Sequence, residues 1–398
     1  MTLTEPETSA FRWDRVTASS ALAYCVLAAA ISIGLVLGEL RSQLHLNGTV
    51  TALHGSTFGL GMILAGAFGS RVVARFGRLR VFWTASTAVV AGVVLFCVGH
   101  IVAVTLLGAT LSGFSAAAIV MVQPGLIADH HGPHRSAAFA AVNAYPPLCG
   151  VTIALVIGVA LSRGVSWRVA FVTFTLLLFA LLVGVGRKAS IPRSTASNPE
   201  PLRALFRTAA VRRAWRDLAL AVMTEFPIGI WGTVYLKEVG HSSAALAPVL
   251  ASTFGLCLFG CRLLIPRLQS LFGSSLGDWS IAATGAGALV LWMVPSLPGK
   301  VAALAIIGFS AGPLYSTSVD RLYAVAPTMD TNAIGSLAAL ASGVAVSSSP
   351  LALGVLADIV GLRRAILIVP VLAAIALWFR RSSRAADRAA VVAFNDAR

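Results

Sequence analysis

Glu225 is the one acidic side chain that falls near the centre of a long apolar segment of this sequence, residues 214–236. An ionisable group at that depth in a membrane is costly to place and is typical of a functional site. The residues one or two helical turns away are small (Ala221, Gly229 and Gly232), and Pro227 predicts a kink just beyond the carboxylate. A carboxylate on a small, kinked helix face is typical of a water-filled cavity.

The expected chemistry of Glu225 is proton binding and release. We expect no Lys or Arg at its depth in any other apolar segment. Burial without a cationic partner favours the neutral carboxyl group, and entry of water favours the charged form. Glu225 is therefore predicted to couple proton movement to the movement of a solute. The structural alternative is a protonated Glu225 that hydrogen-bonds to a neighbouring helix.

Other polar and aromatic side chains are weaker candidates for lining the same cavity. Trp231 and Tyr235 either contact a solute or belong to the belt of aromatic residues at the membrane surface, and the belt is favoured for Tyr235. The remaining candidates could equally hydrogen-bond neighbouring helices together: Asn143, Tyr145, Tyr315 and Thr317.

Charged residues near the segment ends indicate either a gate or an anchor in the lipid headgroups. Glu39 and Arg41 fall near the outer surface, where anchoring is favoured over a gate pair. Asp320 and Arg321 fall at the cytoplasmic end of residues 299–324. For these two, an anchor or an inner gate is favoured over a solute site.

A short loop carries Asp129, His130, His131 and His134, residue types that can bind a metal. No further ligand completes such a site in the sequence, so solvated loop histidines are the favoured interpretation. We expect no metal, no cofactor and no catalytic residue. The five cysteines all lie in apolar segments and are expected to be buried or lipid-facing.

Composition identifies the elements that must position these side chains. The 398 residues are 57% hydrophobic and 11% charged, with a mean hydropathy of +0.86, whereas a soluble domain carries about 25% charged residues. A membrane-spanning helix needs about 20 apolar residues. On that criterion the sequence predicts an all-α polytopic membrane protein with twelve spans, at about 18–40, 49–70, 81–99, 102–128, 137–162, 167–186, 214–236, 245–265, 277–296, 299–324, 333–357 and 363–380.

The net charge of +15 comes from an excess of Lys and Arg, and their distribution along the chain predicts how the protein is oriented in the membrane. With the N-terminus inside, 23 of the 30 Lys and Arg residues fall on the cytoplasmic side and 7 fall outside. This bias predicts that both termini are cytoplasmic and that the protein lies in the cell membrane. A nucleic-acid partner is not expected; the expected partners are a small-molecule substrate, membrane lipids and protons, with the chain acting as a monomer.

The chain divides into two six-span halves. The polar, Pro- and Ser-containing residues 187–213 predict a cytoplasmic linker between bundles at 18–186 and 214–380, with tails at 1–17 and 381–398. Two motif pairs repeat between the halves: residues 158–171 resemble 354–367, and residues 69–77 resemble 260–273. Paired halves with a site near the membrane midplane are the plan of secondary transporters.

The loop after the second span resembles the signature of the major facilitator superfamily, G-x-x-x-D-R-x-G-R-R. The matching segment contains Gly77 with a set of nearby cations, Arg71, Arg75, Arg78 and Arg80, while Ala74 replaces the acidic residue. The six-plus-six plan extends the resemblance over essentially the whole chain. It implies the twelve-helix fold of that family, with spans one, four, seven and ten around a cavity, and a role for the loop in gating.

Two features distinguish the sequence from proton-coupled drug exporters of that family. The embedded Arg of their fourth span corresponds to Ala109, and the antiporter Gly-Pro pattern cannot be matched to Tyr145-Pro146-Pro147. The favoured function is a secondary active transporter of a small organic solute, proton-coupled and working by alternating access. Proton-antiport drug efflux is the alternative within the fold. A membrane-embedded transferase using Asp129, His130 and His134 is the alternative from another class.

Overall fold

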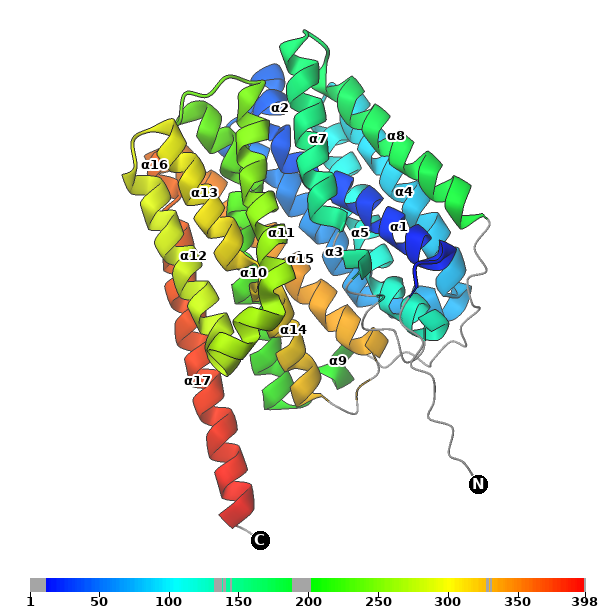
Figure 1. Ribbon diagram of the computed structural model, residues 1–398, viewed down its shortest axis with the longest axis vertical. Helices are drawn as coiled ribbons and strands as arrows, with labels where there is room; N and C mark the ends of the chain where they lie inside the picture. Colours follow the sequence, from blue (N-terminus) through cyan, green and yellow to red (C-terminus); the bar gives the residue numbers. More distant parts are fainter. Residues whose placement is uncertain are drawn as a thin grey trace.

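The computed structural model describes residues 12–131, 138, 141–143, 145–187, 202–326, 329 and 331–396. Over these residues the chain is a bundle of long helices without a β-strand (Figure 1). The N-terminal half contains α1 (Arg15–Ile31), the short 3-10 helix η1 (Ser32–Leu35), α2 (Leu37–Leu44), α3 (Gly48–Phe76), α4 (Arg78–Val98), α5 (Val102–His131), α7 (Tyr145–Ser162) and α8 (Trp167–Gly186).

The C-terminal half repeats this arrangement. It contains α9 (Leu202–Leu205), α10 (Ala209–Glu238), α11 (Leu246–Phe272), η3 (Gly273–Ser275), α12 (Leu276–Met293), α13 (Leu297–Ala311), α14 (Leu314–Val325), α15 (Thr331–Val360), α16 (Leu362–Ala365) and α17 (Ile368–Asp396). The start of α1 and the end of α17 lie at the same end of the bundle (Figure 1). We call that end the terminal face, and the opposite end, where α2, α10 and α15 finish, the distal face.

The predicted fold class is confirmed. Eleven stretches of the described chain are long and apolar enough to cross a membrane, and one of them, Leu246–Met293, contains both α11 and α12. Counting these two helices separately gives the expected twelve. Expected span ten consists of two helices, α13 and α14, which are interrupted at Gly312-Pro313. Within the part of the predicted linker that is described, α10 begins at Ala209, and α17 continues as a helix through the segment predicted as a tail.

The two halves contact each other most closely along α3 and α15. A Cβ atom on Gly59 would lie 2.5 Å from the backbone nitrogen of Ser347, and one on Gly343 would lie 2.7 Å from that of Ile63. Only glycine allows helix backbones to approach so closely. The hydroxyl of Ser56 donates to the Ser347 carbonyl over 2.7 Å, and Ser347 donates back to the Ser56 carbonyl over 3.1 Å.

Candidate functional site

Glu225 lies where the two halves meet. One turn beyond it on α10, Gly229 packs against Gly34 of η1, in the N-terminal half. A Cβ atom added to Gly34 would lie 2.6 Å from the carbonyl oxygen of Gly229. Pro227 lies inside the helix, between the carboxylate and this contact. This close approach depends on Gly34, and Glu225 lies one helical turn from it, toward the terminal face. It does not depend on the small size of the residues around Glu225: a Cβ on Gly229 would lie 3.9 Å from Phe254, and one on Gly232 would lie 4.0 Å from Leu304, both in the C-terminal half.

The Glu225 side chain is half-buried, and no described residue donates a hydrogen bond to it. A carboxylate inside a helical bundle usually pairs with a cation or with hydrogen-bond donors. The lack of a donor among the described residues leaves the carboxylate oxygens available for a proton or a ligand. The structural alternative, a hydrogen bond to a neighbouring helix, is not made with any described residue.

Arg262 on α11 corrects the expectation that no cation shares the depth of Glu225. Measured along their helices from the distal ends at 1.5 Å per residue, Arg262 and Glu225 lie about 24 and about 20 Å deep. The Arg262 charge acts on Glu225 electrostatically. The sequence did not reveal this because the expected span ended at residue 265, whereas α11 continues to Phe272 and places Arg262 well inside the helix.

Two tyrosines complete this group of side chains. Tyr315 on α14 lies within range of the Arg262 charge, and Tyr24 on α1 lies near Tyr315. Tyr24 belongs to the N-terminal half, so both halves contribute to the group. The sequence predicted Tyr315 but not Tyr24, whose position on α1 gives no signal of its own. We call Tyr24, Glu225, Arg262 and Tyr315 the central group.

Trp231 and Tyr235 pack between helices rather than facing an open site. Both side chains are almost fully buried, at 0% and 1% exposed. The indole nitrogen of Trp231 donates to the Pro350 carbonyl of α15 over 3.0 Å, and the Tyr235 hydroxyl donates to the Leu291 carbonyl of α12 over 3.4 Å. Their expected roles as cavity-lining or belt residues are therefore corrected to packing and hydrogen bonding.

The other predicted cavity residues lie apart from the central group. Tyr145 is exposed at the start of α7, where its ring packs edge-on against Trp13 with centroids 5.5 Å apart. Thr317 on α14 donates to the Pro313 carbonyl of the preceding turn over 2.8 Å. Asn143 is half-buried just before α7 and has a polar partner.

Glu39 and Arg41 join the two halves at the distal face. The ammonium of Lys237 lies 2.5 Å from the Glu39 carboxylate, and the guanidinium of Arg41 lies 2.6 Å from the Glu238 carboxylate. In both pairs one partner is on α2 and the other is at the end of α10. Sequence reasoning singled out Glu39 and Arg41 but missed their partners.

A third distal contact between halves caps the start of α3. The carboxylate of Asp358, near the end of α15, accepts the backbone N–H groups of Gly48 over 2.6 Å and Thr49 over 2.7 Å. It also accepts the Thr49 hydroxyl over 2.5 Å. A negative charge at a helix N-terminus satisfies unpaired N–H groups and interacts favourably with the helix dipole.

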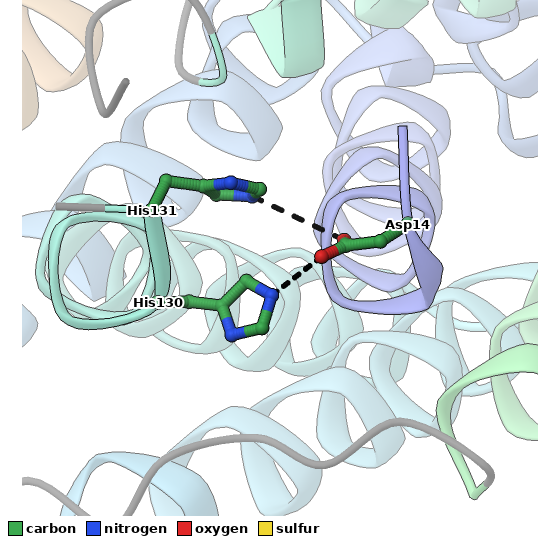
Figure 2. Close-up of side chains that lie close together, drawn as sticks. All are labelled: Asp14, His130 and His131. Atoms are coloured by element: carbon green, nitrogen blue, oxygen red, sulfur yellow. Dashed lines mark hydrogen bonds and ion pairs between the residues drawn. The ribbon is translucent and has the colours of Figure 1, made fainter. Parts of the chain in front are cut away.

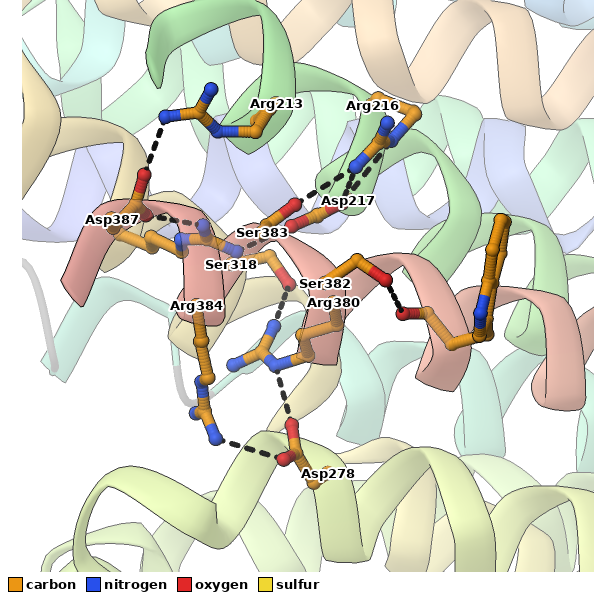
Figure 3. Close-up of polar contacts among 12 residues, drawn as sticks. Arg213, Arg216, Asp217, Asp278, Ser318, Arg380, Ser382, Ser383, Arg384 and Asp387 are labelled. Atoms are coloured by element: carbon orange, nitrogen blue, oxygen red, sulfur yellow. Dashed lines mark hydrogen bonds and ion pairs between the residues drawn. The ribbon is translucent and has the colours of Figure 1, made fainter. Parts of the chain in front are cut away.

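Arg321 belongs to a charge cluster at the terminal face of the C-terminal half. Figure 3 labels the acidic members of the cluster, Asp217, Asp278 and Asp387. Arg321 pairs with Asp217 of α10 and, over 2.7 Å, with Asp387 of α17. Asp320 is exposed and pairs with no described residue. Asp387 also pairs with Arg213, and Asp278 of α12 pairs with Arg380 and Arg384 of α17. These ion pairs connect α10, α12, α14 and α17.

The predicted loop motif forms the turn between α3 and α4. Gly77 has φ +79°, a left-handed conformation that favours glycine. Arg78 pairs over 2.8 Å with Asp129 at the end of α5. The other three cations of the motif have exposed side chains: Arg71, Arg75 and Arg80.

The histidine segment contacts the start of α1 (Figure 2). His130 Nε2 lies 2.5 Å from a carboxylate oxygen of Asp14, and His131 Nε2 lies 2.8 Å from the Thr17 hydroxyl. Partial burial alone raises the pKa of Asp14, but hydrogen bonds from Thr17 and His130 outweigh it and lower the pKa to about 2. Asp14 is therefore ionised at neutral pH. His134 lies outside the described residues.

Comparisons with known proteins agree with this architecture. The sequence model of the Major Facilitator Superfamily matches residues 17–350, and no curated protein matches the chain. A bacterial homologue of the human lysosomal transporter Spinster, solved inward-facing and unoccupied, shares the fold at 15% identity and a TM-score of 0.73, over 93% of this chain and 96% of that chain.

Two further solved structures share the fold at similar identity. One is a mutant of the nucleoside transporter NupG, at 12% identity and a TM-score of 0.75, over 93% of this chain and 98% of that one. The other is the human organic anion transporter MFSD10, at 13% identity and a TM-score of 0.69, over 92% of this chain and all of that one. At these identities the likeness shows the fold alone.

Proposed function

Since the chain belongs to the Major Facilitator Superfamily, we propose that it is a secondary active transporter that moves a small organic solute across the cytoplasmic membrane by alternating access. The fold and its structural neighbours are those of transporters. They favour transport over the transferase alternative. In addition, Asp129, which a transferase would need as an acid or base, is paired with Arg78.

The positions of the contacts between halves support alternating access. Glu39–Lys237, Arg41–Glu238 and the Asp358 cap all join the halves at the distal face. We take the terminal face to be cytoplasmic because the Lys and Arg bias favours that orientation. The structure then corresponds to a state closed to the outside, as in the inward-facing bacterial homologue of Spinster.

The observation that carries the proposal of proton coupling is the position of Glu225. Its carboxylate lies one turn from the Gly34–Gly229 contact, a point where the halves separate when the distal side opens. It has no described hydrogen-bond donor, and the Arg262 charge acts on it from α11. A change in the distance between the halves therefore brings changes in the solvation of Glu225, whereas Arg262 belongs to the same half and stays beside it.

These changes link proton binding to conformation. A carboxylate is stabilised by water and by a nearby cation, and proton binding removes the cost of burying its charge. A solute group that engages Arg262 competes with Glu225 for the same cation, so solute and proton binding are thermodynamically linked. Because Arg262 is present, an anionic group on the solute has a cation with which it can pair.

Transport in proteoliposomes tests the proposal. Purified protein is first screened against sugars, nucleosides, amino acids, organic anions and cationic drugs for compounds that raise its melting temperature. A compound that stabilises the protein is then used to drive proton movement, followed with a pH-sensitive dye inside the vesicles. The direction of proton movement relative to the solute separates uptake by symport from drug efflux by antiport.

Glu225→Gln is expected to retain solute binding and to lose solute-driven proton movement. Asp320→Asn is the matched control, because it makes the same chemical change at an exposed carboxylate with no described partner. Unchanged proton movement in Glu225→Gln rejects Glu225 as the coupling residue. No solute-dependent flux in the wild-type protein, for any stabilising compound, rejects the transporter proposal itself.

A further inference from the structure

Asp14, His130 and His131 form a group of potential metal ligands that transport as proposed above does not use. The group joins the first residue before α1 to the last turn of α5 at the terminal face of the N-terminal half. Both imidazole rings point toward the Asp14 carboxylate (Figure 2). The ligand atoms of the three side chains all lie within 4.8 Å of one another.

We propose that Asp14, His130 and His131 bind a divalent transition-metal ion, with zinc as the favoured ion. Two imidazoles and a carboxylate are a ligand set that suits zinc and its first-row neighbours. With zinc–ligand distances of about 2.0–2.1 Å, neighbouring ligand atoms in a tetrahedral site stand about 3.3 Å apart. The structure gives 2.5 Å between His130 Nε2 and Asp14 Oδ2, and 4.0 Å between His131 Nε2 and the other carboxylate oxygen, Asp14 Oδ1.

These two separations bracket the one that zinc requires. Binding therefore needs the His130–Asp14 pair to open and the His131–Asp14 pair to close by less than about 1 Å each. Because all the ligand atoms lie within 4.8 Å of one another, the pair of histidine nitrogens must close by about 1.5 Å at most. Rotation of the three side chains can supply these changes. The His131 ring would exchange its contact with the Thr17 hydroxyl for the metal, and Thr17 keeps a second partner, Asp14 Oδ1, at 2.8 Å. The Thr17 hydroxyl or a water molecule would occupy the fourth position.

The electrostatic environment favours a cation. The two histidines lie in the last turn of α5, where the carbonyl end of a helix attracts positive charge. The side chains of Asp14, His130 and His131 are 39%, 26% and 10% exposed, so an ion can reach all three.

A metal at this position would join α1 to α5 more rigidly than hydrogen bonds do. The same end of α5 already contacts α4 through Asp129 and Arg78. A bound ion would therefore fix three helices of the N-terminal half at the terminal face. Since an ion that binds only the folded state stabilises it by mass action, zinc is expected to raise the melting temperature.

The competing interpretation is a simple ion pair between Asp14 and His130. His131→Asn separates the two interpretations, because it leaves the Asp14–His130 pair intact and removes one proposed ligand. His100→Asn is the matched control: His100 is an exposed histidine that follows α4, outside the group. Both variants keep Asp14, so the cap on the first turn of α1 is preserved in each.

The experiment measures zinc and cobalt binding to the full-length protein, purified with a tag that lacks histidine. Titration calorimetry gives stoichiometry and affinity, and the visible absorption of cobalt reports its coordination. We expect one ion per chain in wild type and in His100→Asn, at least tenfold weaker binding in His131→Asn, and loss of the zinc-dependent rise in melting temperature. Absence of saturable binding, or equal binding in His131→Asn, overturns the proposal.

Discussion

The distal and terminal faces use charged residues in different ways. At the distal face, the described ion pairs connect the two halves, from α2 to the end of α10. At the terminal face, each described ion pair stays within one half: Arg78–Asp129 in the N-terminal half, and the Asp217, Asp278 and Asp387 cluster in the C-terminal half.

Because of this difference, ion pairs of similar geometry are expected to have different effects at the two faces. A contact that exists in only one conformation shifts the equilibrium between conformations by its own free energy. A contact within a half persists when the halves move, so it stabilises both conformations equally. Removing distal contacts should therefore change which face is open, whereas removing terminal-face contacts should change how readily a half unfolds.

The largest effect is expected from Asp217→Asn. The Asp217 side chain is 1% exposed and pairs with Arg321 and Arg216. Removing one partner of a buried ion pair costs about 3–5 kcal/mol because the remaining charge stays buried. Chemical unfolding in detergent measures this loss. Asp320→Asn, at the exposed neighbour of Arg321, should stay within about 0.5 kcal/mol of wild type. Equal losses in the two variants would contradict the stabilising role of the buried Asp217 ion pairs.

Gly59→Ala is expected to disturb the contact between the two halves next most strongly. The added Cβ would lie 2.5 Å from the Ser347 nitrogen, so α3 and α15 must separate. Overpacking of this kind costs about 1–3 kcal/mol, and here the cost falls on the distal-closed state. The rate at which a membrane-impermeant thiol reagent labels a cysteine at Ser56 should rise.

Gly335→Ala on α15 is the control for this substitution. No atom lies within 4 Å of a Cβ at Gly335, and both glycines lie inside helices. The two variants therefore share the gain in helix propensity and differ only in the clash. An equal labelling rate at Ser56 in both variants would contradict the tight α3–α15 contact.

Asp358→Ala should shift the equilibrium by about 1 kcal/mol, the usual contribution of a helix cap. The Asp358 carboxylate caps α3 from the other half of the molecule. Asn47 caps the same helix from its own half, accepting the Val50 N–H over 2.8 Å. Asn47→Ala should lower the unfolding free energy without exposing Ser56 to reagent, whereas Asp358→Ala should expose it. The reverse pattern would contradict the assignment.

The smallest effect is expected from the Glu39–Lys237 pair. Its side chains are 18% and 25% exposed, and partly exposed pairs contribute about 0.2–1 kcal/mol. A double-mutant cycle with Glu39→Gln and Lys237→Gln, read out by labelling at Ser56, measures the coupling energy between the two side chains. The double variant with reversed charges, Glu39→Lys with Lys237→Glu, should restore part of that energy. Additive single effects would show that the pair does not bias the equilibrium.

The bilayer explains why the fold could be predicted from the sequence. A helix must present about 20 apolar residues to cross it, so the spans are visible in composition alone. The same scarcity of charge singles out Glu225, which the structure places at the contact between halves. In both cases the physical constraint acts on a local stretch of chain.

The rest of the site depends on contacts between distant residues. Glu39 and Lys237 are 198 positions apart, and nothing local to either one encodes the other. Trp231 was predicted at the cavity because its position on the helix was known but its partner, the Pro350 carbonyl, was not. Asp14 was missed as a neighbour of His130 and His131 for the same reason.

Distances between spin labels across the two faces test alternating access most directly. One label pair replaces Arg163 and Arg364, exposed at the distal ends of the two halves, and the other replaces Arg80 and Gln269, exposed at their terminal ends. With a solute found in the stability screen, the account predicts that the distal distance lengthens while the terminal distance shortens in the same sample. Two distances that both stay fixed, or that change in the same direction, would contradict it.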